Sequence, residues 1–117
     1  MFSAGTVLAE PATPADVVLN YYEASREGNI TEMKALIAGS FYNRRKALLE
    51  NNDSYPAFLM DHFHGSTTNI EESNIDNKNQ IAIVTVSTHF SNQSIDTSRL
   101  ILKIDGNGSW KIVDEKN

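Results

Sequence analysis

The segment LMDHFHG, residues 59–65, contains the residue types that most often bind metal ions or transfer protons. Asp61, His62 and His64 lie within four residues of one another. On a helix, a spacing of two residues directs the two histidines to different sides, and Asp61 is poorly placed to share an ion with either. His89 is remote in the sequence. We therefore predict neither a metal site nor a cofactor, and interpret the segment as a helix C-terminus, where a cationic histidine is favourable.

His62 is nevertheless the one residue of this segment that we keep as a candidate for catalysis. Histidine is the side chain whose charge changes near neutral pH, which makes it a common general acid or base. This role depends on whether the elements around the segment place His62 at the mouth of a pocket.

The composition restricts the class of protein. The chain has 117 residues and a net charge of −5, which indicates one domain and argues against nucleic-acid binding, since that function usually requires a basic patch. The basic cluster Arg44, Arg45 and Lys46 is interpreted as a solvated helix face. Because there is no cysteine, a disulfide framework, a thiolate zinc site and a cysteine nucleophile are excluded. No apolar run reaches the ~18 residues of a membrane-spanning helix, so we expect no membrane insertion.

Residues 1–12 show no periodicity and precede a strong helix start, so we predict an irregular tail there. A complete export signal would need a positively charged beginning and a longer apolar run. Val7 and Ala9 still have the small size typical of residues before a cleavage site. Two readings stay open: a disordered tail, or the trimmed end of an export signal, which would place the protein in the periplasm or outside the cell.

The N-terminal half predicts helices. Thr13 can cap a first helix, Pro14 fits its first position, and Asp16 is favourable in its first turn. Gly28 can take the left-handed conformation that ends a helix. The sequence therefore predicts one helix over residues 14–27.

Three shorter helices are expected to follow. Asn29 can cap the second, with Glu32 completing a capping box, and Gly39 ends it. Ser40 is predicted to cap the third, over residues 41–50, and Pro56 to start the fourth, which runs to residue 63.

After Gly65 the pattern changes to strands rich in β-branched residues. They cover residues 68–75, 80–90, 94–104 and 110–115. The short connections between them, including the turn at Asp105–Gly106, predict an antiparallel meander. Helices followed by strands are typical of an α+β fold. We expect the core to contain Val84, Val86, Leu100, Leu102 and Ile112, packed on Val17, Tyr21 and Leu36.

Two stretches resemble the nuclear transport factor 2-like superfamily. They are TPADVVLNYYEASREGNITEMKALI near the start and LILKIDGNGSWKIVDE at the end, so that the resemblance spans residues 13–115. The pattern is most similar to small uncharacterised bacterial domains of that superfamily, many of them exported. The resemblance implies one α+β domain over residues 13–117, with helices packed on a curved antiparallel sheet to form a cone. This scaffold hosts isomerases, dehydratases, ligand-binding modules and dimerisation domains, so fold alone does not assign an activity.

An apolar pocket is expected inside this cone. Neither face of residues 81–90 holds a carboxylate, and the face with Leu100 and Leu102 has no ionisable group, which favours binding over proton transfer. The predicted lining consists of Tyr21, Tyr22, Phe41, Met60, His62, Val86, Phe90 and Trp110. We therefore predict a non-enzymatic binding or interaction module for a small apolar ligand. One alternative is an isomerase-like or dehydratase-like enzyme that uses His62 with Tyr21 or Tyr22, and another is a structural dimerisation domain.

A homodimer is also expected. If Ala82 and the alternate residues after it face the helices, then Ile81 and Ile83 face outward, and Ile101 on the next strand extends the same patch. An antiparallel sheet with one solvated face normally has a polar outer row. Contiguous apolar surface commonly marks a partner site, so we predict that two copies pair through this face. The alternative is that a loop or the N-terminal tail covers Ile81 and Ile83 within one chain.

Overall fold

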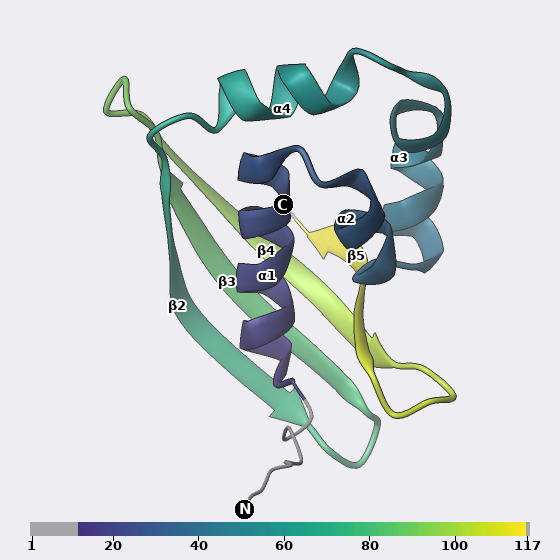
Figure 1. The fold of residues 1–117 in the computed structure, drawn as a ribbon. Coiled ribbons are helices and arrows are strands. Elements are labelled where there is room, and N and C mark those ends of the chain that lie inside the picture. Colours follow the sequence, from purple (N-terminus) through teal and green to yellow (C-terminus); the bar gives the residue numbers. More distant parts are fainter. Residues whose placement is uncertain (1–11, 117) are drawn as a thin grey trace, which may run out of the picture.

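The computed structural model describes residues 12–116, which form four helices and one four-stranded antiparallel sheet (Figure 1). The helices are α1 (Pro14–Glu27), α2 (Ile30–Ala35), α3 (Gly39–Asn51) and α4 (Tyr55–His62). The strands are β2 (Thr67–Asp76), β3 (Ile81–His89), β4 (Ile95–Ile104) and β5 (Trp110–Lys116). The predicted α+β architecture is confirmed. The predicted tail and export signal fall outside the described residues, apart from Ala12.

The start of α1 is fixed as its sequence indicates. The Asp16 backbone N–H donates to the Thr13 hydroxyl at 3.1 Å, and the Thr13 N–H donates to the Asp16 carboxylate at 3.2 Å. At the other end Gly28 has a φ of 65°, and a Cβ there would lie 2.9 Å from the carbonyl oxygen of Pro56. Glycine is therefore needed both for the left-handed conformation and for the close approach of α4 to the end of α1.

The junction between α2 and α3 differs from the prediction. Ile37 is not helical but forms an isolated bridge with Ile112 of β5. The Ala38 N–H donates to the Ile112 carbonyl, and the Ile112 N–H donates to the Leu36 carbonyl. α2 therefore ends at Ala35 and α3 begins at Gly39, so the predictions that Gly39 ends α2 and that Ser40 caps α3 are both wrong. Ala38 takes the N-cap position of α3.

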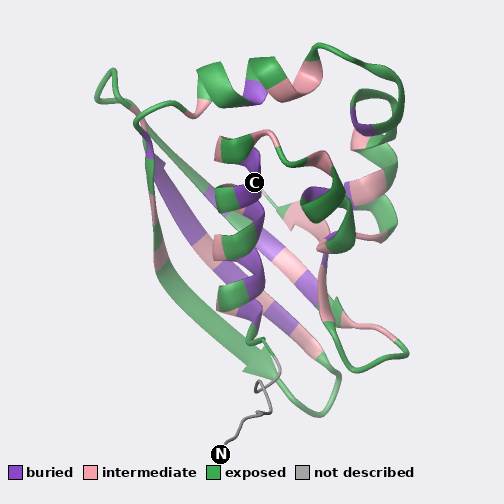
Figure 2. Ribbon diagram, in the orientation of Figure 1, coloured by how far each residue is buried: buried purple, intermediate pink, exposed green. Residues whose placement is uncertain are grey.

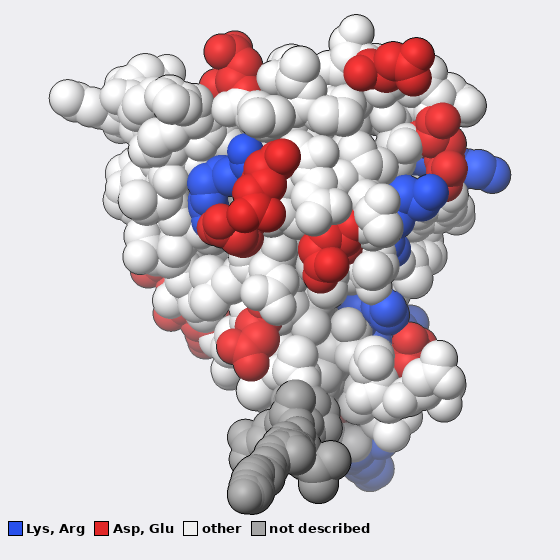
Figure 3. Space-filling model, in the orientation of Figure 1, with Lys and Arg blue, Asp and Glu red and all other residues white. Residues whose placement is uncertain are grey.

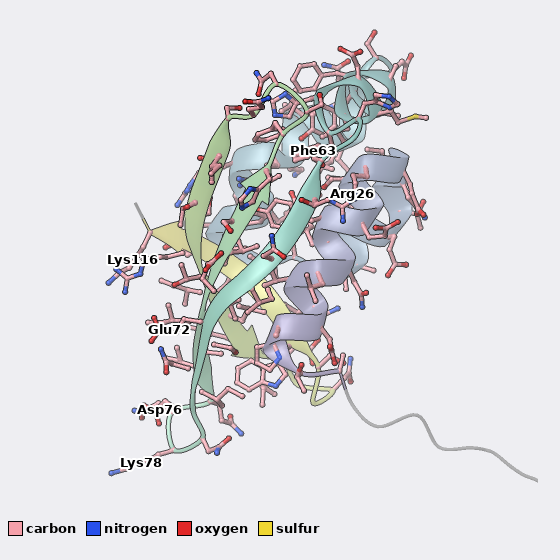
Figure 4. All side chains as sticks on the ribbon, turned by 90° about the vertical axis from the view of Figure 1, so that its left-hand side faces the viewer. Arg26, Phe63, Glu72, Asp76, Lys78 and Lys116 are labelled. Carbon is pink, nitrogen blue, oxygen red and sulfur yellow. The ribbon has the colours of Figure 1, made fainter. Side chains whose placement is uncertain are left out.

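The sheet has the strand order β2-β3-β4-β5. Its register shifts at Glu71 in β2, between Ile70 and Glu72, and at Val113 in β5, between the partners of Ile101 and Leu102. Such bulges bend a strand and increase its twist, and the sheet curves around α1 (Figure 1). Arg26 at the end of α1 donates to the Thr68 hydroxyl at 2.8 Å and so ties α1 to the beginning of β2 (Figure 4).

The core lies between α1 and the inner face of the sheet. Buried residues alternate with less buried ones along β3 and β4 and line the side of α1 that faces them (Figure 2). All the predicted core residues are found there, with Leu36 only half-buried. No helix in residues 12–116 is long and apolar enough to cross a membrane.

Candidate functional site: an aromatic pocket at the open end of the cone

A pocket of about 250 Å³ opens between α1, α3, α4 and the inner face of the sheet. Helix α4 crosses this end of the molecule above the end of α1 (Figure 1). The lining residues are Tyr21, Tyr22, Phe41, Arg45, Tyr55, Phe58, Leu59, His62, Phe63, Thr88, Phe90, Asp96, Ser98, Leu100 and Glu115. Ligand pockets commonly measure about 300–1,000 Å³, so this one suits a small molecule such as a substituted single ring.

The walls of the pocket are one continuous chain of contacting aromatic rings. In order, these rings belong to Phe41, Tyr21, Tyr22, Phe63, His62 and Phe58, with Tyr55 beside Phe58 and Phe90 against both His62 and Phe63. Neighbouring ring centroids lie from 4.8 to 6.2 Å apart, within the range of favourable aromatic pairs. Phe63 stands at the junction between α4 and β2 (Figure 4).

Charged and hydroxyl groups complete the lining. Arg45 on α3 forms an ion pair with Glu115 on β5, with 3.3 Å between Nη2 and Oε1. Its guanidinium also donates to the Phe41 carbonyl at 3.2 Å and lies 3.5 Å from the centroid of the Phe41 ring. Asp96 and Ser98 project from alternate positions of β4.

The prediction of an apolar pocket is therefore wrong. The predicted inner face of β4 began at Leu100, whereas the strand begins at Ile95 and carries the same face back to Ser98 and Asp96. Extending the two-residue alternation to the start of the strand would have placed Asp96 in the pocket. Glu115 lies on β5, whereas the prediction of an apolar pocket used the faces of β3 and β4 alone. Arg45 was interpreted as part of a solvated cluster.

The structure brings together five of the eight predicted lining residues: Tyr21, Tyr22, Phe41, His62 and Phe90. The other three lie elsewhere. Met60 is 51% exposed and lies against Gly28, while Val86 is buried in the core below the pocket. Trp110 begins β5, at the opposite end of that strand from Glu115, and lines a separate hollow beside Leu36.

His62 lies at the mouth of the pocket as part of its aromatic wall. Its ring stacks on Phe58 with centroids 5.5 Å apart and lies 5.1 Å from Phe90. Within residues 12–116, no three His, Asp or Glu side chains are grouped so that they could hold a metal ion.

A second hollow, of about 530 Å³, lies on the outer face of the sheet. Ile81, Ile83 and Ile101 line it together with Val113. These isoleucines are half-buried, and the hollow is bordered by Gly39 and Ser40 at the start of α3 and by the charged residues Lys103 and Asp114. The other described helices lie on the opposite side of the sheet (Figure 4). The predicted strand parity is therefore confirmed, and the apolar outer row exists.

The tyrosines of the pocket predict a loss of stability at high pH. Burial and, more weakly, the Glu115 carboxylate together raise the pKa of the Tyr22 phenol to about 12. An unfolded chain releases the same proton near pH 10. The contribution of protonated Tyr22 to the stability of the folded state is complete below about pH 10. It is lost as the pH rises toward 12, because the phenol ionises at lower pH in the unfolded state than in the folded state. Unfolding in urea at several pH values should show Tyr22→Phe losing roughly 2 kcal/mol less than the wild type over this range. Equal losses in both proteins would contradict this assignment.

The comparisons with known proteins support the fold. No family profile matches the sequence, and no curated protein is significantly similar to it. A candidate NTF2-like transpeptidase from Campylobacter jejuni superposes with a TM-score of 0.65 at 16% identity, over 88% of this chain and 99% of that one. A candidate ketosteroid isomerase from Shewanella frigidimarina gives 0.57 at 20% identity, over 85% and 89%.

A third solved structure, a protein of unknown function with a cystatin-like fold from Methylobium petroleophilum, gives a TM-score of 0.53 at 14% identity, over 92% of this chain and 78% of that one. At these identities the likeness extends to the fold and not to an activity. The chain therefore has the NTF2-like, cystatin-like cone fold that the sequence resemblance implied.

Proposed function

We propose that this protein is a binding module that holds a small, partly apolar molecule in the aromatic pocket. The proposal rests on one observation: the aromatic rings that line the pocket are partly exposed, and charged and hydroxyl groups lie beside them. Aromatic clusters that serve only packing are buried, whereas Phe58 is 57% exposed and Tyr55, Phe63 and Phe90 are half-buried. Apolar walls with a few convergent polar groups are typical of ligand sites.

The polar groups are suited to orienting a ligand. Burial raises the pKa values of Tyr21 and Tyr22, so both phenols stay protonated at neutral pH and can donate hydrogen bonds but cannot act as bases. The Arg45–Glu115 pair fixes the floor of the pocket between α3 and β5. These features support binding more directly than proton transfer by the tyrosines.

A pair of variants on neighbouring residues of β4 tests the proposal. Ser98 is buried and lines the pocket, whereas Thr97 is exposed on the opposite face. Titrations of benzyl alcohol, benzylamine and benzoate are followed by chemical shifts in nuclear magnetic resonance spectra. We expect at least one probe to shift the signals of pocket residues. Ser98→Leu, which fills the pocket, should weaken that binding at least tenfold, or ~1.4 kcal/mol, and Thr97→Leu should not. The absence of binding by all three probes would refute the proposal.

The second candidate function is proton transfer in the same pocket. It is favoured by Asp96 and His62, which both line the pocket and are able to exchange protons. Cyclohexanone in deuterated water provides the test, because a general base would exchange its α-protons. Exchange that is catalysed by the wild type and lost in Asp96→Asn or His62→Gln would favour the enzyme. A rate no higher than that of the buffer would leave binding as the function.

We also propose that a second copy of the chain covers the outer face of the sheet. Support comes from the largely apolar hollow around Ile81, Ile83 and Ile101, on the face of the sheet opposite α1, with Lys103, Asp114 and the start of α3 at its rim. Packing it against the same face of a partner would remove this apolar surface from water.

Sedimentation tests the dimer. At tens of micromolar the wild type should sediment as a dimer, and Ile83→Glu as a folded monomer, because a charge would be buried at the interface. Leu48→Glu is the control, since Leu48 is 40% exposed on α3, away from the sheet. A monomeric wild type would remove the proposal.

A further inference from the structure

The charged side chains that line the aromatic pocket differ in whether they have an ion-pair partner. The Arg45 guanidinium is already bound to Glu115 at 3.3 Å, to the Phe41 carbonyl at 3.2 Å and to the face of the Phe41 ring. Asp96, by contrast, has no ion-pair partner in residues 12–116. The lining therefore contains one cation that is neutralised and one carboxylate that is not.

Asp96 is an exposed residue that lines the pocket beside the exposed part of the aromatic wall. It pairs across the sheet with Thr88 of β3, which also lines the pocket. Phe90, which follows directly after β3, lines the pocket as well. Phe58, Phe63 and Phe90 keep part of their surface exposed. Aromatic faces attract organic cations through the negative potential above the ring, and the attraction grows as water is excluded.

The electrostatic environment of Tyr22 agrees with a negative pocket. After burial, the largest causes that raise its pKa are the carboxylates of Glu115 and, more weakly, Asp96. Both negative charges therefore act at the centre of the aromatic wall. An anionic ligand would meet this potential, and the one arginine of the lining is already paired with Glu115.

Figure 3 shows the charged side chains on one face of the molecule. On the face that carries α1 and α4, acidic and basic side chains are interspersed (Figure 3). The net charge of −5 attracts cations to the whole molecule, whereas the groups that line the pocket act on a bound ligand at close range.

We infer that the pocket selects small organic cations, namely ammonium compounds that carry one ring or a compact alkyl group. The inference rests on the proposed binding function and names its ligand class. The apolar part of such a ligand lies among Tyr22, Phe63 and Phe90, and its ammonium group lies between Asp96 and the aromatic faces. The volume of about 250 Å³ limits the ligand to this size.

Three probes of similar size and different charge test the inference: benzylamine, which is cationic at neutral pH, benzyl alcohol and benzoate. In calorimetric or spectroscopic titrations we expect benzylamine to bind about tenfold more tightly than benzyl alcohol, and benzoate to bind most weakly. Added salt should weaken the binding of benzylamine and leave that of benzyl alcohol unchanged.

Two variants test separately how the Asp96 charge and the aromatic rings contribute to the binding of benzylamine. Asp96→Asn should weaken benzylamine binding about three- to tenfold and leave benzyl alcohol unaffected. Phe58→Leu should weaken benzylamine binding by a similar factor, because it removes an exposed ring and keeps an apolar side chain. The control is Asp53→Asn, which removes an exposed carboxylate outside the pocket and should change neither affinity.

The possible outcomes distinguish this inference from the proposed function. Equal binding of benzylamine and benzyl alcohol, unchanged in Asp96→Asn, would overturn the cation selectivity and leave the binding function intact. Tighter binding of benzoate would overturn it in favour of recognition by Arg45. If none of the probes bound, both the inference and the proposed function would fail.

Discussion

Replacing Leu102 with alanine is expected to lower the free energy of unfolding by about 2–5 kcal/mol. Leu102 lies in the second half of β4, is fully buried, and faces α1 from the inner side of the sheet. Truncation removes apolar contacts on all sides and leaves a cavity that neighbouring strands can only partly close, which is why such changes are among the most costly in a core. Urea unfolding monitored by circular dichroism measures the change.

Ile95→Ala on the same strand is the control. Ile95 is 60% exposed, and surface substitutions usually change stability by no more than about 0.5 kcal/mol. If Leu102→Ala cost less than about 1 kcal/mol, the inner face of β4 would be assigned wrongly, and the placement of Asp96 and Ser98 in the pocket would fail with it.

The second large effect is expected at the floor of the pocket. Arg45→Met keeps most of the apolar stem but removes the ion pair with Glu115, the donation to the Phe41 carbonyl and the contact with the Phe41 ring. Arg45 and Glu115 are 24% and 22% exposed, so the cost should lie below that of breaking a fully buried pair. We expect a loss of about 1–3 kcal/mol.

The next residue provides a matched control. Arg44 pairs with Asp114, but these side chains are 54% and 41% exposed, and exposed pairs typically contribute less than about 1 kcal/mol. Arg44→Met should therefore cost clearly less than Arg45→Met. A double-mutant cycle with Glu115→Gln should give a coupling energy of at least about 0.5 kcal/mol for Arg45. Equal costs for the two arginines would mean that the floor of the pocket is solvated.

The sequence predicted the elements well where local signals are strong. The helix start at Thr13, the end at Gly28 and the four strands follow from capping, glycine conformation and the two-residue alternation. The junction at Ile37 could not be predicted in this way, because its helical spacing is overridden by pairing with Ile112, a residue far along the chain. Such pairings depend on tertiary structure, which local propensity does not report.

The site was harder to predict than the fold. The tyrosines, Phe41, His62 and Phe90 were expected in the pocket because aromatic residues of the helices and of the end of β3 converge there. Arg45 appeared to be one of three similar basic residues, and its lower exposure and its contacts with Phe41 separate it from Arg44. Its partner Glu115 lies 70 residues away. Spacing within one element cannot reveal a pair formed between α3 and β5.

A crystal structure of the protein with benzylamine at saturating concentration tests the central claim most directly. The proposed function and ligand class predict the probe inside the pocket, with its ring among Tyr22, Phe63 and Phe90 and its ammonium group facing Asp96. Density for the probe only at the surface, with Phe58 and His62 folded inward to fill the pocket, would contradict the account. The aromatic chain would then be part of the core and not a binding site.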